Sequence, residues 1–378
     1  MIVAIVLVGC GSTPPPEDAP YVLKPAALES FGQQLEAVAN DETRMGQLFD
    51  FNALGERAVP LGTPNRAMFI QGMVQGISEP GSGFVAQIAG SGAYTFRGVV
   101  WRDGLPHARF RFVVTQGGFN FHDLLVISGG GRGPRVADIH VLTSAEYLSQ
   151  TVGRFAALTA GDGNLVSMIL RRGRLSPDGV ERLTDFVTAT RESPEEAMRT
   201  YEALPADLKE QRFVQIMRVQ AASGLDTDRY LAVMTDAQTH LAPDDPSLAV
   251  TLLDAYYLRE DWPNALASIR AVRSEYDDPY VWALESRLLT FSGDPAGALA
   301  LADRGIEAEP TLIDTHDAAL VAALRSADTE RALAELAQLE ASLGDMTMMV
   351  GQPGYEGLEA LLAQRAAAPP AQPLAQPD

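Results

Sequence analysis

The chain is poor in residues that build metal and redox sites. Its 378 residues include one cysteine and five histidines. A single cysteine excludes an intrachain disulfide, so oxidative cross-linking cannot stabilise the fold. The sequence also lacks the Gly-x-Ser-x-Gly, His-Glu-x-x-His and Cys-x-x-Cys motifs, which place a nucleophile or metal ligands at fixed spacing. We therefore predict a protein that is not an enzyme, with no cofactor and no catalytic or metal-binding residues.

Positive charge is also scarce. The formal net charge is -20, which leaves no basic stripe along the chain. Because attraction to phosphates dominates nucleic-acid binding, this charge makes DNA and RNA unfavourable partners. Residues 176–345 alone hold 32 acidic and 14 basic residues. A partner of that region should therefore be neutral or basic.

The sequence has no apolar run of the roughly 20 residues that a membrane-spanning helix needs. It does open with a short apolar run that ends Leu-Val-Gly-Cys at Cys10. This ending resembles a bacterial lipoprotein signal. The resemblance implies that residues 1–9 are removed, that Cys10 is acylated, and that the membrane is contacted through this lipid anchor only. The proline-rich residues 10–20 would form an extended tether, and Gly11 after the cysteine implies an outer-membrane lipoprotein.

A repeated side-chain pattern occupies the second half of the chain. Small or apolar residues recur in steps of 34, 34, 33 and 34, at Ala197, Leu231, Ala265, Ala298 and Ala332. This period is typical of stacked helical hairpins, because one hairpin cannot bury its apolar face alone and the closest helix crossing has room only for a small side chain. We predict an all-α helical solenoid of about five hairpins over residues 176–345 and a capping helix over 346–365. The tail 366–378 is predicted to be disordered.

One stretch within this period carries a family resemblance. Residues 293–298 read Gly-Asp-Pro-Ala-Gly-Ala, the pattern continues to Pro310, and Trp282 stands at an aromatic position of the preceding helix. These residues resemble a tetratricopeptide repeat. The resemblance implies a scaffold that binds a protein or peptide in a groove lined by the first helix of each hairpin. Carried over position by position, it assigns that groove to Arg182, Asp254, Tyr257, Tyr280, Arg287 and Asp317. The alternative for each is an ordinary solvated side chain.

The first half of the chain combines helical and strand patterns. Over residues 24–90 apolar side chains recur at helical spacing, and Thr63–Pro64 has the form of a helix start. Gly72 and Gly76 are spaced for close packing against another helix in a soluble core. From 93 to 142 the period changes to two, with three short turns, which predicts a four-stranded antiparallel meander.

These patterns predict an α+β domain over residues 21–158, with helices first, the sheet second, and a helix from Ser144 to about Leu158 leading out of it. A linker over residues 159–175 would follow. The order of elements is similar to that of nuclear-transport-factor-like and cystatin-like domains. Along the first strand, alternation predicts a shared face for Tyr94, Phe96, Gly98 and Val100.

Two histidines and two aspartates fall in residues 119–123 and 137–140, on the last two strands. Such residues could bind a metal or transfer a proton. Alternation puts His122 and Asp123 on opposite faces, so the pattern favours a cross-strand polar network without catalytic function. The glycine-rich stretch 128–134 lacks the Lys-Ser/Thr of a phosphate loop and is predicted to be a hairpin turn.

Three hypotheses on function follow from the sequence. The favoured one is a lipid-anchored scaffold of the bacterial cell envelope that mediates protein–protein interaction. In the second, the α+β domain is a small-molecule-binding or catalytic module and the array localises it. A deep, partly polar pocket near His122 or Asp138 would favour that hypothesis. The third is a soluble intracellular adaptor, if Cys10 is not acylated.

Overall fold

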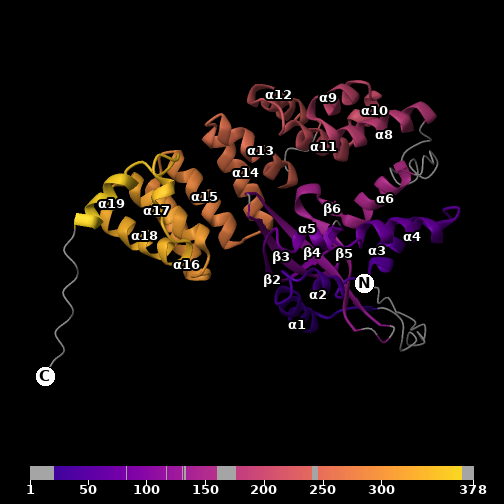
Figure 1. Ribbon diagram of the computed structural model, residues 1–378, viewed down its shortest axis with the longest axis horizontal. Coiled ribbons are helices and arrows are strands. Elements are labelled where there is room, and N and C mark those ends of the chain that lie inside the picture. The colour runs from indigo at the N-terminus through magenta and orange to yellow at the C-terminus, as the bar shows by residue number, and fades with distance from the viewer. Residues whose placement is uncertain are drawn as a thin grey trace, which may run out of the picture. The chain divides into compact units, whose positions relative to one another are not determined.

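The computed structural model describes residues 21–159, 176–240 and 246–367, apart from positions 82, 116, 130 and 132. The chain forms two compact units, residues 1–188 and 189–378, and the division falls within helix α8 (Pro177–Glu192) (Figure 1). The predicted signal segment 1–9, the tether with Cys10, nearly all of the linker 159–175 and most of the tail 366–378 lie outside the described residues.

Five helices precede the four long strands of the first unit. Their bounds are α1 (Pro25–Glu36), α2 (Glu42–Gly46), α3 (Phe51–Ala58), α4 (Arg66–Ile77) and α5 (Phe84–Ile88). α2 and α3 begin at aspartates: Asp41 accepts a hydrogen bond from the backbone N–H of Arg44, and Asp50 from that of Ala53, both at 3.0 Å. These caps satisfy N–H groups that have no partner within the helix.

The predicted antiparallel meander is confirmed and is extended by two short strands. The strands are β1 (Tyr21–Val22), β2 (Gly92–Arg102), β3 (Leu105–Val114), β4 (Phe119–Ser128), β5 (Arg135–Val141) and β6 (Glu146–Tyr147). They pair in the order β2-β3-β4-β5-β6, and β1 joins the end of β4. Asp103 and Gly104, with φ of 51° and 76°, form the β2–β3 turn, as a two-residue hairpin with two left-handed residues requires.

Strand β2 contains a bulge that the sequence pattern does not predict. Phe96 pairs with Phe110 and Gly98 with Arg109, so Arg97 is an extra residue. Gly98 has φ of 108°, a conformation that glycine adopts without steric cost. The predicted face is therefore wrong beyond Phe96, because Val99 takes the place expected for Val100 and packs against the core.

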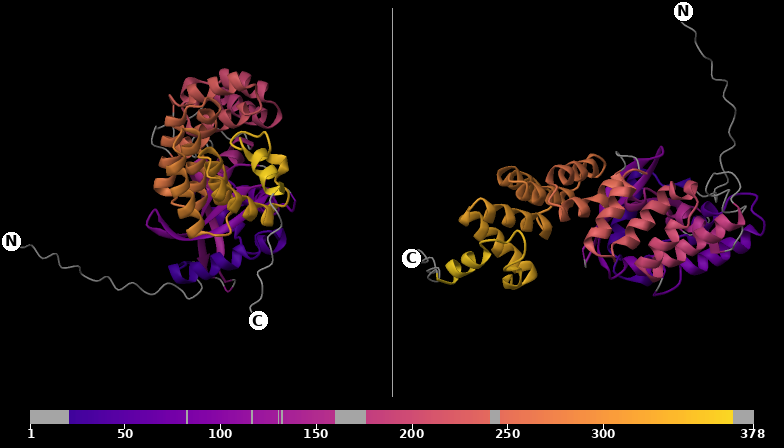
Figure 2. Two further views of the ribbon diagram at one scale, coloured as in Figure 1. Left: turned by 90° about the vertical axis from the view of Figure 1, so that its left-hand side faces the viewer. Right: turned by 90° about the horizontal axis from the view of Figure 1, so that it is seen from above.

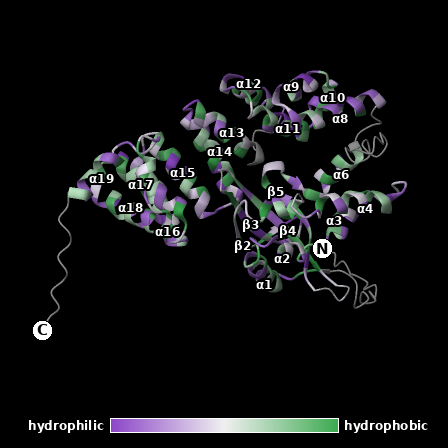
Figure 3. Ribbon diagram, in the orientation of Figure 1, coloured by the Kyte–Doolittle hydropathy of each residue, from purple (hydrophilic) through white to green (hydrophobic). Residues whose placement is uncertain are grey.

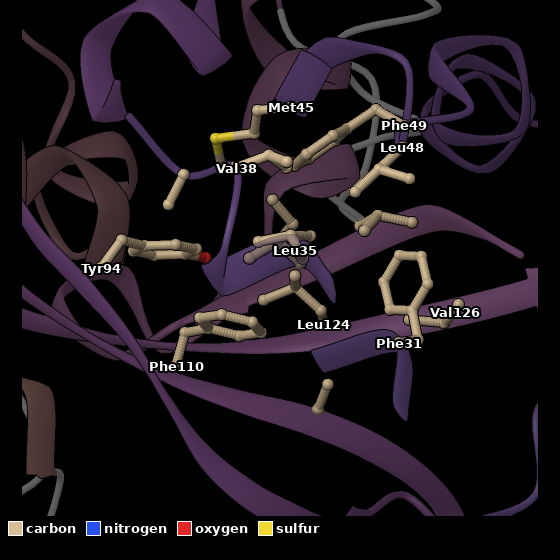
Figure 4. Packing of buried hydrophobic residues seen from close by; sticks show 14 of the residues in the cluster. Phe31, Leu35, Val38, Met45, Leu48, Phe49, Tyr94, Phe110, Leu124 and Val126 are labelled. Atoms are coloured by element: carbon tan, nitrogen blue, oxygen red, sulfur yellow. The ribbon is translucent and has the colours of Figure 1, made fainter. Parts of the chain in front are cut away.

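The core of the first unit lies between the N-terminal helices and one face of the sheet (Figure 4). Phe31 and Leu35 of α1 are buried against the strands, as their spacing predicts. The rings of Tyr94 and Phe110 stack with centroids 4.6 Å apart. Each fully buried side chain of this size contributes about 1.5–3 kcal/mol, so this layer holds helices and sheet together.

Two predictions for α4 are wrong. The helix begins after Asn65, which has left-handed φ and makes no side-chain cap bond. The Thr63 hydroxyl, the expected cap, instead donates to the Pro60 carbonyl at 2.8 Å. The close helix packing predicted for Gly72 and Gly76 is also absent among the described residues, since a Cβ placed on either would meet nothing within 4 Å.

The helix that leads out of the sheet also starts later than predicted. α6 spans Leu148–Thr159, whereas the sequence favours a start at Ser144. Before the helix begins, Glu146 and Tyr147 pair with Val141 and His140 as strand β6. Glu146 and Tyr147, which the helical pattern assigns to the first turn of the helix, therefore pair with β5 instead.

The second unit is an array of packed helices consistent with a helical repeat. Its helices are α9 (Pro194–Glu202), α10 (Ala206–Lys209), α11 (Arg212–Ala222), α12 (Thr227–Ala237), α13 (Pro246–Leu258), α14 (Trp262–Glu275), α15 (Pro279–Phe291), α16 (Pro295–Ala308), α17 (Ile313–Arg325), α18 (Thr329–Leu343) and α19 (Leu358–Ala367). From α13 to α18 each helix packs against the next, α15 also packs against α17, and α19 covers α18 (Figures 1 and 2).

The second helix of each hairpin begins in the same way. Its N-cap side chain accepts a hydrogen bond from the backbone N–H three residues on, at Ser193, Asp226, Asp261, Asp294 and Asp328. The fourth helical residue is a buried alanine in four of these helices: Ala197, Ala265, Ala298 and Ala332. In α12 that place belongs to Tyr230, one residue before Leu231. Ser286 Oγ donates to the Ala298 carbonyl at 2.8 Å, so the helices α15 and α16 come close where the sequence predicts a small residue.

The turns within the last three hairpins share one backbone geometry. The residue before the N-cap is left-handed in each, with φ of 54°, 93° and 56° at Glu260, Gly293 and Ala327. The N–H of the following aspartate donates to the carbonyl five residues back, at 2.9, 2.8 and 2.9 Å for Asp261, Asp294 and Asp328. This bond is characteristic of the Schellman motif that ends helices. The repeat is therefore a repeat of backbone geometry as well as of side chains.

Candidate functional site

A cluster of three aromatic rings lies on the array at the α13–α14 turn. Tyr257 of α13 is 5.7 Å from both Trp262 of α14 and Phe291 of α15, measured between ring centroids. Trp262 and Phe291 stack at 5.4 Å. Tyr257 remains 38% exposed. We call these three residues the aromatic cluster. They form a rigid, partly exposed apolar surface with one hydroxyl group.

An ion pair on neighbouring first helices lies close to Tyr257. Nη1 of Arg287 on α15 is 2.5 Å from Oδ2 of Asp317 on α17, and the Tyr355 hydroxyl donates to the other oxygen of Asp317. Burial lowers the pKa of Arg287, but the charges of Asp317, Tyr355 and Tyr257 outweigh it and raise that pKa overall. Burial and the Asp317 charge raise the pKa of Tyr355. Arg287 therefore stays charged while a third of its side chain is exposed.

The chain between α18 and α19 reaches this ion pair. Tyr355 is 4% exposed and packs with Val321 and Leu358 in the core at the end of the array. A Cβ on the neighbouring Gly354 would lie 3.2 Å from the ring of Phe291. The capping segment is thus joined to α17 by the hydrogen bond from Tyr355 and approaches the aromatic cluster at Phe291.

The other residues assigned to the groove lie in different surroundings. Tyr280 is only 6% exposed, so its side chain belongs to the packing and not to an open surface. Asp254 on α13 is exposed. The pKa of Tyr230 is raised mainly by the burial of that tyrosine and, second, by the charge of Asp254. Arg182 on α8 pairs with Asp178, one helical turn earlier, at 2.9 Å. The structure thus brings Tyr257, Arg287 and Asp317 together, and Asp254 lies one helical turn before Tyr257 on α13.

Sequence reasoning missed Trp262, Phe291 and Tyr355. Phe291 lies 34 residues after Tyr257, one repeat period along the chain, and this spacing could have indicated it. Trp262 follows the N-cap Asp261 directly, so it is carried by the turn and not by a helix face. Tyr355 precedes α19 and belongs to no repeat, so no periodic signal could have indicated it.

The polar residues of the sheet separate onto two faces, as alternation predicts. Asp123 of β4 pairs in register with His140 of β5. Its Oδ1 is 2.7 Å from Nε of Arg109, and its Oδ2 is 2.9 Å from Nη2 of Arg102. Arg102 reaches this face because the bulge at Gly98 reverses the alternation of β2. This is a structural ion-pair network, and both carboxylate oxygens of Asp123 are engaged.

The electrostatics of Asp123 oppose a catalytic role. Burial raises the pKa of this carboxyl, but hydrogen bonds and charges from Arg109 and Arg102 outweigh it, so the pKa lies below its usual value. A general base near neutral pH needs the opposite shift. Asp123 therefore remains a carboxylate that holds two arginines on the sheet.

His122 lies on the core face, among rings. It contacts Tyr94, Phe84 and Phe112, and its Nδ1 is 3.1 Å from the Tyr94 hydroxyl. Burial lowers the pKa of His122 to about 4, and the Asp123 charge opposes this only in part. Burial likewise raises the pKa of Tyr94, so the phenol stays protonated beside the neutral imidazole. His122 is a neutral core histidine at physiological pH.

Asp138 connects the sheet to α6. Its carboxylate accepts hydrogen bonds from Ser149 Oγ at 2.6 Å, Ser149 N at 3.1 Å and Ile139 N at 2.9 Å. Burial raises the pKa of Asp138 despite these bonds. A depression of about 320 Å³ does lie between α2, α5 and the end of α4, lined by Glu42, Phe51 and Ile77 among others, but neither His122 nor Asp138 lines it.

No protein-family model matches the chain, and no curated protein matches it. Among the described residues, no three His, Cys, Asp or Glu side chains are grouped so that they could hold a metal ion. Across the same residues, no helix combines the length and apolar character needed to cross a membrane.

Proposed function

We propose that this protein is a non-enzymatic, lipid-anchored scaffold of the bacterial cell envelope, whose tetratricopeptide-like array binds another protein. The single observation that carries the proposal is the surface formed by the aromatic cluster with Arg287 and Asp317. These side chains come from three successive first helices of the array, α13, α15 and α17, and from the α14 start. A surface built across repeats is what an array offers to an extended partner.

The chemistry of this surface favours a protein partner. Tyrosine, tryptophan and arginine are the side chains that most often dominate the energy of protein interfaces. Tyr257 and Arg287 are both about one third exposed, and their neighbours hold them in place. The acidic excess of residues 176–345 favours a neutral or basic partner, because complementary charge speeds association and fixes register.

The lipid anchor of the proposal rests on the sequence ending Leu-Val-Gly-Cys at Cys10. Mass analysis of the N-terminus, on protein purified from cell membranes, tests it directly. An N-terminal Cys10 carrying acyl chains supports the envelope location. An unmodified Met1 would contradict the envelope location. The hypothesis of a soluble adaptor would then remain.

A photo-crosslinking experiment on the full chain tests the array surface. A photoreactive phenylalanine replaces Tyr257, and in the control it replaces Leu343, which is 57% exposed at the end of α18. We expect one reproducible crosslinked protein at position 257, its loss when Arg287→Ala is added, and no such product at position 343. Equal products at the two positions, or products indifferent to Arg287, would contradict the proposed surface.

A further inference from the structure

Helix α4 and the loop before it expose apolar side chains. Leu61 in the α3–α4 loop is 87% exposed, and Met68 on α4 is 64% exposed. The helix buries Met73 against Ala58 and Val59, yet apolar residues follow it along most of its length (Figure 3). The other large apolar residues of α4 are buried or half-buried. Leu61 and Met68 are therefore the apolar side chains here that are open to contact with something outside this chain.

The exposed side of α4 carries no charge. Its residues form a stripe that repeats every four positions: Ala67, Met68, Gln71, Gly72, Gln75 and Gly76. The two glycines have no described neighbour within 4 Å of a Cβ position. The stripe is therefore open and flat, and no charged side chain on it would need to be desolvated.

The charge around the stripe is balanced, because exposed Glu56 and Glu79 flank the range that holds its two arginines. Residues 57–78 contain two arginines and no acidic residue, in a chain of net charge -20. Arg57 is exposed. Arg66 donates from Nε to the Val59 carbonyl at 2.9 Å and from Nη2 to the Glu56 carbonyl at 2.5 Å. These bonds hold the loop with Leu61 next to the start of α4.

We propose that Leu61 and the exposed stripe of α4 form a second membrane contact, which lies on the surface of the bilayer that holds the lipid anchor. This inference rests on the proposed function, because the anchor supplies the membrane. Ten residues lie between Cys10 and Tyr21 in β1, a reach of at most about 40 Å. So short a tether keeps the first unit at the bilayer and gives a weak surface contact a high effective concentration.

The same features distinguish a lipid surface from a protein partner. Leucine and methionine side chains insert among acyl chains, and glutamine and glycine tolerate the headgroup layer. A region whose charges balance is not repelled by anionic headgroups, whereas most of this acidic chain would be. A basic or neutral protein partner would instead favour the acidic region of residues 176–345.

The test uses the full chain attached to vesicles of phosphatidylethanolamine and phosphatidylglycerol through a maleimide lipid that reacts with Cys10, the single cysteine. Hydrogen exchange of the α4 amides is measured with and without vesicles. Leu61→Gln/Met68→Gln is the test variant. Leu343→Gln/Met348→Gln is the matched control, since those residues are 57% and 77% exposed in the second unit.

We expect vesicles to slow exchange of the α4 amides about tenfold, given the apolar area that two such side chains bury. The test variant should lose this protection and the control should keep it. Equal exchange with and without vesicles would overturn the inference. So would a dimer in vesicle-free solution that Met68→Gln dissociates, because the stripe would then belong to a second copy. The chemical coupling makes this result independent of whether cells acylate Cys10.

Discussion

Gly293 and Ala327 occupy the same position in two successive turns of the array, both left-handed, with φ of 93° and 56°. Each is followed by an aspartate that caps the next helix. Glycine adopts this conformation without strain at position 293. At position 327 alanine is strained, since a left-handed conformation costs a non-glycine residue about 1–2 kcal/mol.

Opposite substitutions at these two positions should have opposite effects. Ala327→Gly should raise the free energy of unfolding of the array by about 0.5–1 kcal/mol, after the greater chain entropy of glycine is subtracted. Gly293→Ala should lower it by about 1 kcal/mol, with no steric clash because nothing lies within 4 Å. Urea unfolding followed by Trp262 and Trp282 fluorescence, in a Trp101→Phe background, measures both. Two changes of the same sign would contradict the shared turn geometry.

The hydrogen bond from Tyr355 should hold the capping segment on the array. Tyr355→Phe removes a donor to the Asp317 carboxylate, and a hydrogen bond to a charged acceptor contributes about 1.5–3 kcal/mol. Hydrogen exchange of the α19 amides should accelerate accordingly. In an Asp317→Ala background the same substitution should cost little. If its cost is equal in both backgrounds, the two residues are not coupled.

The buried imidazole of His122 should make the first unit sensitive to mild acid. An unfolded histidine titrates near 6.5, whereas burial lowers the pKa of His122 to about 4. Between these values the unfolded chain binds more protons, so the free energy of unfolding falls as the pH falls from about 6.5 to about 4. The full loss is on the order of 3 kcal/mol.

Urea midpoints at pH 7, 6, 5 and 4 measure this effect. His122→Gln should be less stable at pH 7 but should lose less stability on acidification, so the two curves converge toward pH 4. Tyr94→Phe keeps the titrating ring and should keep the slope while losing about 1 kcal/mol for the hydrogen bond. Parallel curves for the native chain and His122→Gln would show that another group causes the acid sensitivity.

How much the sequence could predict depends on whether the determinants are local. The array is predictable because a cap such as Asp294 and a small residue such as Ala298 act within one turn and recur with each hairpin. The repeat geometry also assigns Arg287 and Asp317 to the groove, but it does not predict the ion pair between them. Tyr280 shows the limit of that logic, because burial depends on packing that no helical period describes.

The sheet shows a second limit. Alternation correctly separates His122 from Asp123, because β4 is regular there. It fails on β2, because a single extra residue reverses every following side chain. Arg102 could not be predicted as a partner of Asp123 without the bulge, and the glycine that allows the bulge is one of 33 in the chain.

Gly98 should therefore control the ion-pair network on the sheet. Its φ of 108° is one that other residues adopt only at a cost of about 1–3 kcal/mol. Gly98→Ala can avoid this strain by losing the bulge, which would turn Arg102 away from Asp123. Gly104→Ala, at the β2–β3 turn with φ of 76°, introduces comparable strain without altering the register at the bulge, and is the matched control.

A double-mutant cycle between Arg102→Gln and Asp123→Asn measures the coupling energy between these two residues of the network. Asp123→Asn alone should cost about 3–5 kcal/mol, because it leaves two arginines next to a neutral amide in a buried site. The coupling energy between the two residues should be present in the native chain and in Gly104→Ala, and absent in Gly98→Ala. A coupling energy that survives Gly98→Ala would mean that the bulge is maintained by its neighbours and not by glycine.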